Sequence, residues 1–404
     1  MNETFDIVLI TITFYPAIDT SARLMYDLAE GLVKKGLKVL VITPNREYLN
    51  PSNVFSVDEE VTGIKVKRVE VPRLDKDEAL QKLILYKTFS KKALKYTKTI
   101  NKRLLLSLLP PLFVPYEVLS LSLKHKVPFL FIVYDLLPDA WINRKRLNPR
   151  NPLAIILKHQ TKELLTKSDR VVVIGRDMKE YILEEYGIST NKVSVIQNWS
   201  RITDEAYSKK EEALNEKFTI LYAGNMGEAQ GLENVVDAAR KLQEVDSDIE
   251  ILFVGNGRKK PELMAKAKQY ELKNLVFKDY VKDDMLRNIM SKASALLVTL
   301  RKESKGMSVP SKLYYYMSAG KPILAIVPEK SETAISIEED QLGIVCNQDS
   351  TDSITEGILK LKNDTALWNQ SASNTARAFR EKYNNESAVD KYYKVIKELL
   401  EETE

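Results

Sequence analysis

The sequence predicts an α/β protein with two doubly wound domains, each built around a parallel sheet. Short apolar runs of strand length alternate with amphipathic helical stretches along most of the 404 residues. The alternation falls into two blocks that are separated by a polar segment, and a chain of this length is long enough for two domains. We expect the two domains to face each other across a ligand-binding cleft.

In the first block, runs rich in Val, Ile and Leu are typical of buried parallel strands. They cover residues 7–12, 39–43, 64–71, 128–133, 171–174 and 193–196, with helical patterns such as 21–35 and 153–167 between them. A polar, aperiodic stretch at 197–217 indicates a linker. The second block repeats the scheme at residues 219–223, 250–254, 275–277, 295–299, 322–326 and 343–346. We therefore predict domains over residues 1–200 and 201–385, and a helix over 386–404 that packs back on the first domain.

The composition argues against several classes of protein. No segment is long and apolar enough to span a membrane, and the first residues lack the pattern of a secretory leader. Cys346 is the one cysteine, so neither internal disulfides nor a cysteine-based zinc site is expected, and its apolar neighbours predict a buried thiol. His125 and His159 are the only histidines. We expect a cytoplasmic protein with no metal and no cofactor.

The segment Lys82–Arg103 is rich in lysine and contains no acidic residue. Five of its lysines follow helical spacing, and the apolar run LLLSLLPPLF comes directly after it; these lysines are Lys87, Lys91, Lys95, Lys98 and Lys102. A basic amphipathic helix beside an apolar patch is typical of binding to an anionic membrane, where each basic residue contributes about 1 kcal/mol. A solvated core helix is the alternative interpretation. Nucleic acid is not expected as a partner, because no aromatic-studded strand pattern supports it.

Ligands of open α/β sheets bind beyond the carboxyl ends of the strands, so the turns there are the places to look for a site. After the first strand come Asp19, Thr20 and Ser21, which are suited equally to capping the next helix and to holding an anion at its N-terminus. The pair Asp246 and Asp248 precedes a strand instead, which indicates a solvated turn rather than a metal site.

Two glycine-rich turns of the second block point to a diphosphate. In AGNMGEAQGLE, Gly224, Gly227 and Gly231 let the backbone approach a ligand closely before a helix begins near Leu232. The turn VGNGRKKPEL follows the next strand and ends in basic residues. A tight strand-to-helix connection remains the rival interpretation of each turn. Lys312, at the start of a helix in VPSKLYYYMSAGKP, would add a positive charge where the helix dipole disfavours one.

Together these stretches resemble a GT-B glycosyltransferase of the retaining group called family four, in the branch that assembles lipid-linked cell-surface polysaccharides. The resemblance runs nearly end to end, through FYPAIDTSARLMYDLAEGLVKKGLKVLVIT, VYDLLPD, SDRVVVIGRDMKEYI, VSVIQNW, LYAGNMGEAQGLENVVDAAR, ILFVGNGRKKPEL and VPSKLYYYMSAGKPILA. It implies a metal-independent transfer of a sugar, often N-acetylated, from a UDP-sugar on the second domain. The acceptor would be a polyprenyl-diphosphate-linked saccharide on the first domain, at the inner face of the cell membrane.

The resemblance also implies a mechanism and a set of site residues. The leaving diphosphate would help deprotonate the acceptor hydroxyl, so the protein would mainly stabilise charge on the leaving group. Asp135 and Lys312 are the catalytic candidates. Tyr134, Asp19, Thr20 and Ser21 are assigned to the acceptor. The donor would contact Arg201, Gly224, Asn225, Met226, Gly227, Gln230, Arg258, Tyr280, Ser308, Val309, Ser311 and Tyr315.

In the donor site, the chain departs from the family pattern at four positions. Asn225 and Gln230 stand where many relatives have the basic residues that clamp the diphosphate, so Lys312, with Arg258 or Arg201, becomes the expected replacement. Met307 and Tyr315 stand where many relatives have two glutamates, and Tyr315 is expected to hold the ribose through its hydroxyl or a neighbouring backbone group.

These departures leave two other functions open. A non-catalytic partner subunit could keep the fold without the clamp. A nucleotide-sugar 2-epimerase can share the fold, although two histidines leave little room for its chemistry. A nicotinamide dehydrogenase is disfavoured, because no G-x-G-x-x-G follows the first strand.

Overall fold

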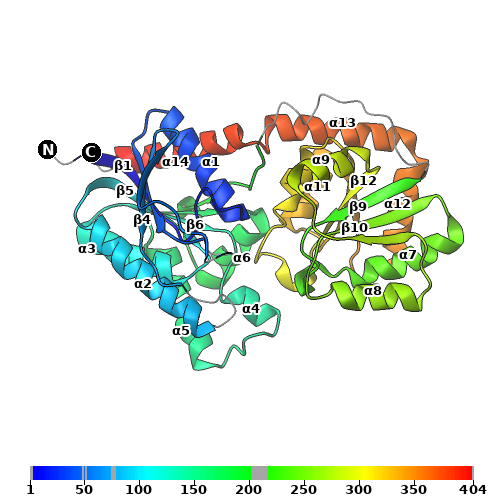
Figure 1. The fold of residues 1–404 in the computed structure, drawn as a ribbon, viewed down its shortest axis with the longest axis horizontal. Coiled ribbons are helices and arrows are strands. Elements are labelled where there is room, and N and C mark those ends of the chain that lie inside the picture. The colour runs from blue at the N-terminus through cyan, green and yellow to red at the C-terminus, as the bar shows by residue number, and fades with distance from the viewer. Residues whose placement is uncertain (1–2, 48–49, 51, 74–78, 202–216, 403–404) are drawn as a thin grey trace. The chain divides into compact units, whose positions relative to one another are not determined.

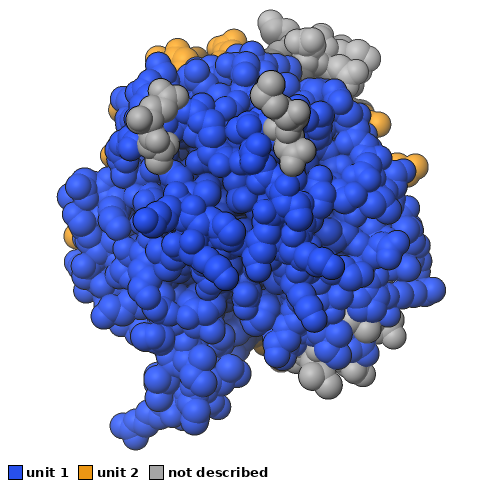
Figure 2. All heavy atoms as spheres, turned by 90° about the vertical axis from the view of Figure 1, so that its left-hand side faces the viewer, with its two compact units in different colours: residues 1–198, 385–404 blue, residues 199–384 orange. Residues whose placement is uncertain are grey.

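The computed structural model describes residues 3–47, 50, 52–73, 79–201 and 217–402, which fold into two α/β units (Figure 1). Residues 1–198 and 385–404 make up the first unit, and residues 199–384 make up the second; Figure 2 colours them separately on one face of the molecule. The helix at the end of the chain therefore belongs to the first unit. Most of the predicted linker lies outside the described residues.

The first unit is built on an eight-stranded sheet in the order β3-β4-β2-β1-β5-β6-β7-β8. Its strands are β1 (Thr4–Ile10), β2 (Val39–Pro44), β3 (Asp58–Val61), β4 (Ile64–Val69), β5 (Asn101–Leu109), β6 (Phe129–Val133), β7 (Arg170–Val173) and β8 (Val193–Val195). Neighbouring strands are parallel except at the edge, where β3 runs antiparallel to β4. The runs predicted from the sequence therefore form one doubly wound sheet.

Helices cover this sheet and close its core. They are α1 (Thr20–Lys34), α2 (Ala79–Thr97), α3 (Phe113–His125), α4 (Asp139–Asn143), α5 (Pro152–Lys167), α6 (Arg176–Tyr186) and α14 (Asn385–Glu401). In Figure 1, α2, α3 and α5 lie side by side, and α3 packs against both of the others. Helix α14 packs on α1, where a Cβ on Gly31 would lie 2.5 Å from Val389 Cγ2, so glycine allows the two helices to approach closely.

The structure corrects the prediction for the segment Lys82–Arg103. Helix α2 ends at Thr97, and the apolar run after it forms β5, whose Leu104 and Leu105 are fully buried between β1 and β6. Lys102 Nζ donates to the carbonyl of Thr97 at 2.7 Å, and Arg103 pairs with a carboxylate of β1. A strand with parallel neighbours on both sides is buried on both faces and reads as a continuous apolar run, so its pattern is easily taken for an apolar patch.

The second unit is built on a six-stranded, fully parallel sheet in the order β11-β10-β9-β12-β13-β14. Its strands are β9 (Phe218–Ala223), β10 (Ile249–Val254), β11 (Leu275–Lys278), β12 (Ala295–Thr299), β13 (Ile323–Ile326) and β14 (Gly343–Cys346). Its helices are α7 (Glu233–Val245), α8 (Lys260–Gln269), α9 (Asp283–Lys292), α10 (Lys312–Met317), α11 (Glu332–Asp340), α12 (Thr351–Asn363) and α13 (Thr365–Glu381).

The strand order of this sheet reverses between β9 and β12. The chain runs from β9 outward through β10 to β11, and then returns to place β12 on the other side of β9. Ligands of open α/β sheets bind at such a switch point, beyond the carboxyl ends of the strands. The turns after β9 and β12 are therefore the first places to look for a site.

The core of the second unit lies between the sheet and helices α7, α8 and α12, and it includes Tyr222, Val236 and Phe253. Cys346 ends β14 with its thiol buried, and burial raises the pKa of this thiol to about 12, so the predicted buried cysteine is confirmed. Across the described parts of both units, no helix has the length and apolarity needed to cross a membrane.

Candidate functional site

The two glycine turns of the second unit pack directly against each other. We call residues 224–231, after β9, the first glycine turn, and residues 255–259, after β10, the second. A Cβ on Gly255 would lie 2.2 Å from Gly224 O, and one on Gly257 would lie 2.4 Å from Met226 O. Both second-turn glycines also have positive φ angles. The second turn therefore needs glycine at both positions to pack against the first turn, as the rival interpretation of a tight connection expects.

The side chain of Tyr316 takes the place of strand pairing at the switch point between β9 and β12. The ladder between these strands reaches only Leu221 and Leu296. Beyond it, the Tyr316 hydroxyl accepts a hydrogen bond from Ala223 N at 2.6 Å and donates one to Ala223 O at 3.0 Å. One side chain thus satisfies the backbone groups that a longer β12 would have paired, and the two strands diverge where the first glycine turn begins.

Lys312, the first residue of α10, lies against the start of the first glycine turn. Its Nζ is 3.7 Å from the centroid of the Tyr222 ring, and a Cβ on Gly224 would lie 3.3 Å from it. The nitrogen is buried and has no hydrogen-bond partner among the described residues. Burial lowers the pKa of Lys312 to about 7. An anion at the first glycine turn would supply the missing counter-charge.

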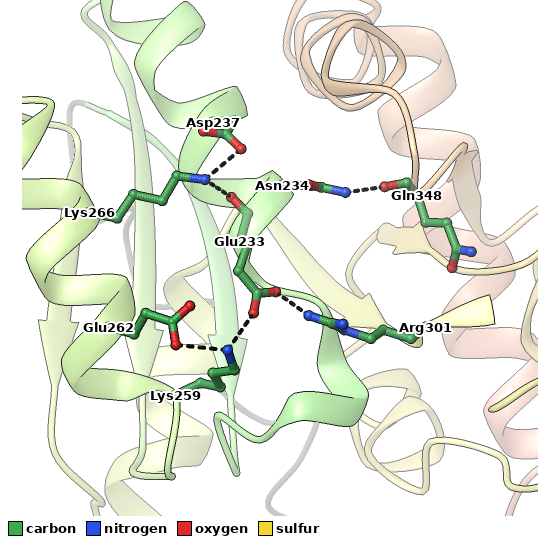
Figure 3. Close-up of polar contacts among 8 residues, drawn as sticks. All are labelled: Glu233, Asn234, Asp237, Lys259, Glu262, Lys266, Arg301 and Gln348. Carbon is green, nitrogen blue, oxygen red and sulfur yellow. Dashed lines mark hydrogen bonds and ion pairs between the residues drawn. The ribbon is translucent and has the colours of Figure 1, made fainter. Parts of the chain in front are cut away.

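Arg301, which follows β12, lies at the other end of the same turn. Its backbone N–H donates to Ala229 O at 3.0 Å, and a Cβ on Gly231 would lie 3.0 Å from Arg301 Cγ. Its guanidinium donates to Glu233 Oε2 at 2.9 Å, and the other oxygen of this carboxylate lies 3.5 Å from Lys259 Nζ (Figure 3). Sequence reasoning missed Arg301, because its only signal is a place after a strand at the switch point.

Glu233 is held ionised by these neighbours. Burial alone would raise the pKa of its carboxyl. The hydrogen bond from its own backbone and the charges of Arg301 and Lys259 outweigh burial and hold the pKa below the usual range. Glu233 therefore stays a carboxylate near neutral pH and keeps its ion pair with the Arg301 guanidinium.

The other predicted donor residues lie in three kinds of environment. Gln230 Oε1 is buried without a partner among the described residues, whereas Met226 points into the core. Asn225, Arg258, Arg201 and Tyr280 have exposed side chains, and that of Tyr280 is 72 % exposed. Ser308 and Ser311 are half-buried, and Val309 is buried. The structure thus brings Lys312 to the turn that contains Gly224, Gly227 and Gln230.

The three adjacent tyrosines of α10 have separate surroundings. Tyr314 is fully buried, and the centroid of its ring lies 5.7 Å from that of Tyr383. Tyr316 bonds to Ala223 at the end of β9, as described above. Tyr315 is half-buried as a residue, whereas Tyr314 and Tyr316 are buried, and its hydroxyl oxygen is itself buried. Met307, which stands where relatives have the other glutamate, is fully buried. Tyr315 therefore remains the predicted ribose contact.

In the first unit, Asp19 acts as a helix cap. Its Oδ1 accepts from Ala22 N at 3.1 Å at the start of α1, and its Oδ2 accepts from the Thr13 hydroxyl. Both carboxylate oxygens are therefore engaged within the unit, which favours capping over anion binding. Thr20 is exposed and Ser21 is half-buried.

Tyr134 and Asp135 follow β6, whose carboxyl end lies two strands from that of β1. Burial raises the pKa of Asp135, and the positive charge of Arg144 opposes this shift. The Tyr134 hydroxyl is buried without a hydrogen-bond partner among the described residues, and burial raises its pKa well above the usual value. Asp135 is half-buried, so a ligand can reach it, whereas Tyr134 is a core residue.

The acidic pair set aside as a solvated turn lies, as expected, at the amino end of β10. Lys362 Nζ lies 2.6 Å from Asp246 Oδ2 and 3.9 Å from Asp248 Oδ2. Within the described ranges, no group of three or more histidine, cysteine, aspartate or glutamate side chains is placed to hold a metal ion.

Comparison with known proteins matches each unit to a glycosyltransferase family. Residues 21–199 match the family described as Glycosyltransferase Family 4, and residues 203–382 match the one described as Glycosyl transferases group 1. The chain belongs to the GT-B glycosyltransferases of group 1 and family 4. This confirms the predicted fold of two Rossmann-like units with parallel sheets.

Individual relatives are distant. The chain is 25% identical over 242 residues to WbjE of Pseudomonas aeruginosa, named as a probable glycosyltransferase, covering 58% of this chain and 59% of the relative. It is 31% identical over 161 residues to WcaI of Escherichia coli K12, named for colanic acid biosynthesis, covering 38% and 39%. The chain thus spans less than two thirds of the length of these relatives. HepE from Anabaena, solved in complex with UDP, has the same fold, with a TM-score of 0.71, 12% identity, and coverage of 97% of this chain and 100% of HepE.

Proposed function

We propose that the protein is a retaining, metal-independent glycosyltransferase. It moves a sugar, often N-acetylated, from a UDP-sugar to a polyprenyl-diphosphate-linked saccharide in the synthesis of a cell-surface polysaccharide or glycan. The observation that carries this proposal is the buried amino group of Lys312, which lies without a hydrogen-bond partner among the described residues against Gly224.

A buried amino group without a counter-charge destabilises a folded protein, so its retention at a turn of the switch point favours a ligand-binding role. The diphosphate of a UDP-sugar supplies the negative charge, and the backbone of the first glycine turn can approach it closely. The same fold in HepE, which was solved with UDP, supports this choice of donor. The resemblance to WcaI supports a role in surface polysaccharide synthesis.

In this proposal, Lys312 stabilises the charge that develops on the leaving diphosphate. The bond between the anomeric carbon and the diphosphate oxygen breaks as the acceptor oxygen bonds to the same face of that carbon. The acceptor proton passes to the departing phosphate oxygen, so UDP leaves and configuration is retained. Asp135, whose pKa is raised by burial, contacts the acceptor hydroxyl and positions it.

We also propose that the protein acts at the inner face of the cell membrane through helix α2. Lys87, Lys91 and Lys95 are exposed along this helix, and Leu83 and Ile84 at its start are 40% and 42% exposed. Exposed lysines beside exposed aliphatic side chains suit an anionic bilayer surface. Helix α2 alone would contact the membrane, because β5 is buried in the core of the first unit.

A lipid-extraction assay tests the proposed reaction. Membranes are incubated with the protein and a panel of radiolabelled UDP-sugars, and lipid is extracted and counted. We expect one donor to label the lipid fraction, and Lys312→Ala to abolish the label. Lys302→Ala is the control, because this lysine is on the surface and 3.4 Å from Asp349. Binding of UDP without turnover of any donor would favour the non-catalytic partner.

Sedimentation with anionic vesicles tests the membrane surface separately. Reversing the charges of Lys87, Lys91 and Lys95 to glutamate should release the protein. The control reverses Lys241, Lys302 and Lys397, which are exposed elsewhere and change the net charge equally. Unchanged binding of the α2 variant would contradict the proposal.

A further inference from the structure

We propose that Arg301 is the second cation of the donor site and binds the diphosphate at the opposite end of the first glycine turn from Lys312. This inference rests on the proposed function and names a residue that none of the sequence motifs discussed above singled out. It explains how a turn with Asn225 and Gln230 in place of basic residues can still hold two phosphoryl groups.

The positions of the two cations carry the inference. Lys312 comes from α10 and lies against Gly224, the first residue of the turn, whereas Arg301 comes from the end of β12 and lies against Gly231, the last. The hydrogen bond from Arg301 N to Ala229 O fixes the main chain of the arginine to the turn itself. The turn therefore runs between two positive side chains at the switch point of the sheet.

The guanidinium keeps hydrogen-bond donors for a ligand. One N–H of Nη2 is used by Glu233, and Nε is buried without a partner among the described residues. An arginine has five N–H donors, and a phosphate presents oxygens that match its fork. The Arg301 side chain is 42% exposed, so a ligand can reach it.

Glu233 positions this guanidinium and occupies only part of its hydrogen-bonding capacity. The carboxylate lies between Arg301 and Lys259, and Lys259 Nζ is also 2.7 Å from Glu262 Oε2 (Figure 3). One oxygen of Glu233 thus holds one edge of the guanidinium. Glu233 begins α7 directly after the turn, so Arg301 is held over Gly231 and its remaining donors stay available.

Two cations at opposite ends of one turn suit a ligand with two phosphoryl groups. A diphosphate presents two separated centres of negative charge, and uridine presents none. Arg301 should therefore contribute to the binding of UDP and not to the binding of uridine. A purely structural role for Arg301 would affect both ligands alike, so the ratio of the two affinities separates contact from support.

Calorimetric titration with UDP and with uridine tests the inference. We expect Arg301→Ala to weaken UDP binding at least tenfold and to leave uridine binding unchanged. Arg301→Lys should fall between the two proteins, because it keeps the charge and loses the fork. Arg287→Ala is the control, since this arginine lies on α9, where it pairs with Asp284, and its loss should leave both affinities unchanged.

Other outcomes overturn the inference in distinguishable ways. If Arg301→Ala weakens UDP and uridine equally, the residue only supports the fold. If Arg301→Ala binds UDP as the unaltered protein does while Lys312→Ala does not, the inference fails and the proposed donor site stands. If the unaltered protein binds no UDP, the proposed function itself fails. Should Arg301→Ala not fold, Arg301→Lys and Glu233→Gln provide the same ratio, with a smaller change.

Discussion

The first glycine turn of the second unit and the loop after β1 of the first unit satisfy their polar groups in different ways. In the second unit, the amino group of Lys312 and the amide oxygen of Gln230 are buried beside the first glycine turn without hydrogen-bond partners among the described residues. In the first unit, the loop after β1 contains no glycine, and its groups bind one another. Asp19 uses both oxygens, and the buried Arg68 donates to the carbonyl of Tyr15 at 2.5 Å.

The difference distinguishes a turn that is built to bind a ligand from a loop that is already stabilised by its own contacts. An edge with unmet buried groups is destabilised until a ligand of complementary charge arrives, so binding there should raise the stability of the folded protein. A loop whose groups are paired internally gains little from an anion. We therefore expect the donor site to be formed before the donor binds, whereas the loop after β1 contributes shape rather than charge to the acceptor.

The largest expected effect comes from breaking the support of the donor edge. Gly255→Ala would place a Cβ 2.2 Å from Gly224 O at a φ of +135°. Together the overlap and the strain should lower the free energy of unfolding by about 3–5 kcal/mol. Gly36→Ala is the matched control, because its φ is +89° but nothing lies within 4 Å, so about 1 kcal/mol is expected.

Urea denaturation measures both changes. If the two substitutions cost the same free energy of unfolding, the second glycine turn does not support the first, and the difference between the two edges loses its structural basis.

A smaller effect is the dependence of UDP binding on pH. The pKa of Lys312 is about 7 in the free protein, and a bound diphosphate should raise it. Below pH 7 the lysine is already charged, so its contribution to affinity stays constant. Above pH 7, binding must take up a proton, so the affinity should fall by up to about tenfold per pH unit.

The stability of the ligand-free protein should change in the opposite direction. The pKa of Lys312 is lower in the folded protein than the usual 10.5, so the unfolded chain binds more protons between pH 7 and 10.5. The free energy of unfolding should therefore rise through this window by up to about 1.4 kcal/mol per unit from this group. Lys312→Met should remove both dependences, which calorimetry and denaturation at a series of pH values can check; profiles unaffected by the substitution would contradict the assignment.

The smallest effect concerns the first unit. Asp19→Ala should lower the free energy of unfolding by about 1 kcal/mol through loss of the cap, and leave UDP affinity unchanged. Asp364→Ala, which removes the cap of α13 in the second unit, is the matched control and should cost a similar amount. Loss of sugar transfer without loss of stability would instead assign Asp19 to the acceptor.

Most strands were predictable from the sequence, because buried parallel strands leave continuous apolar runs. The exceptions are instructive. Strand β5 follows closely after a lysine-rich helix, so the local sequence pattern was interpreted as one amphipathic segment. Only the pairing of β5 with β1 and β6 shows that the strand is a separate element. The edge strand β3 is short and acidic, and Val61 is its one apolar residue.

The site was predictable only where a residue conflicted with its local surroundings. Lys312 at a helix start conflicts with the helix dipole, and this conflict identified it correctly as a neighbour of the first glycine turn. Arg301 shows no such conflict, since a surface arginine after a strand is ordinary. The second glycine turn was counted as support for a diphosphate site, because the sequence does not distinguish glycines that approach a ligand from glycines that pack on a neighbouring main chain.

The contacts of Tyr316 also matter for protein engineering. A library aimed at donor preference would naturally vary all three adjacent tyrosines. Substituting Tyr316 leaves the N–H and C=O of Ala223 without their hydrogen-bond partner, and substituting Tyr314 removes the packing against Tyr383. Most members of such a library would therefore misfold. Diversity is best concentrated at position 315, because Tyr315 is only half-buried and its substitution should affect the scaffold least.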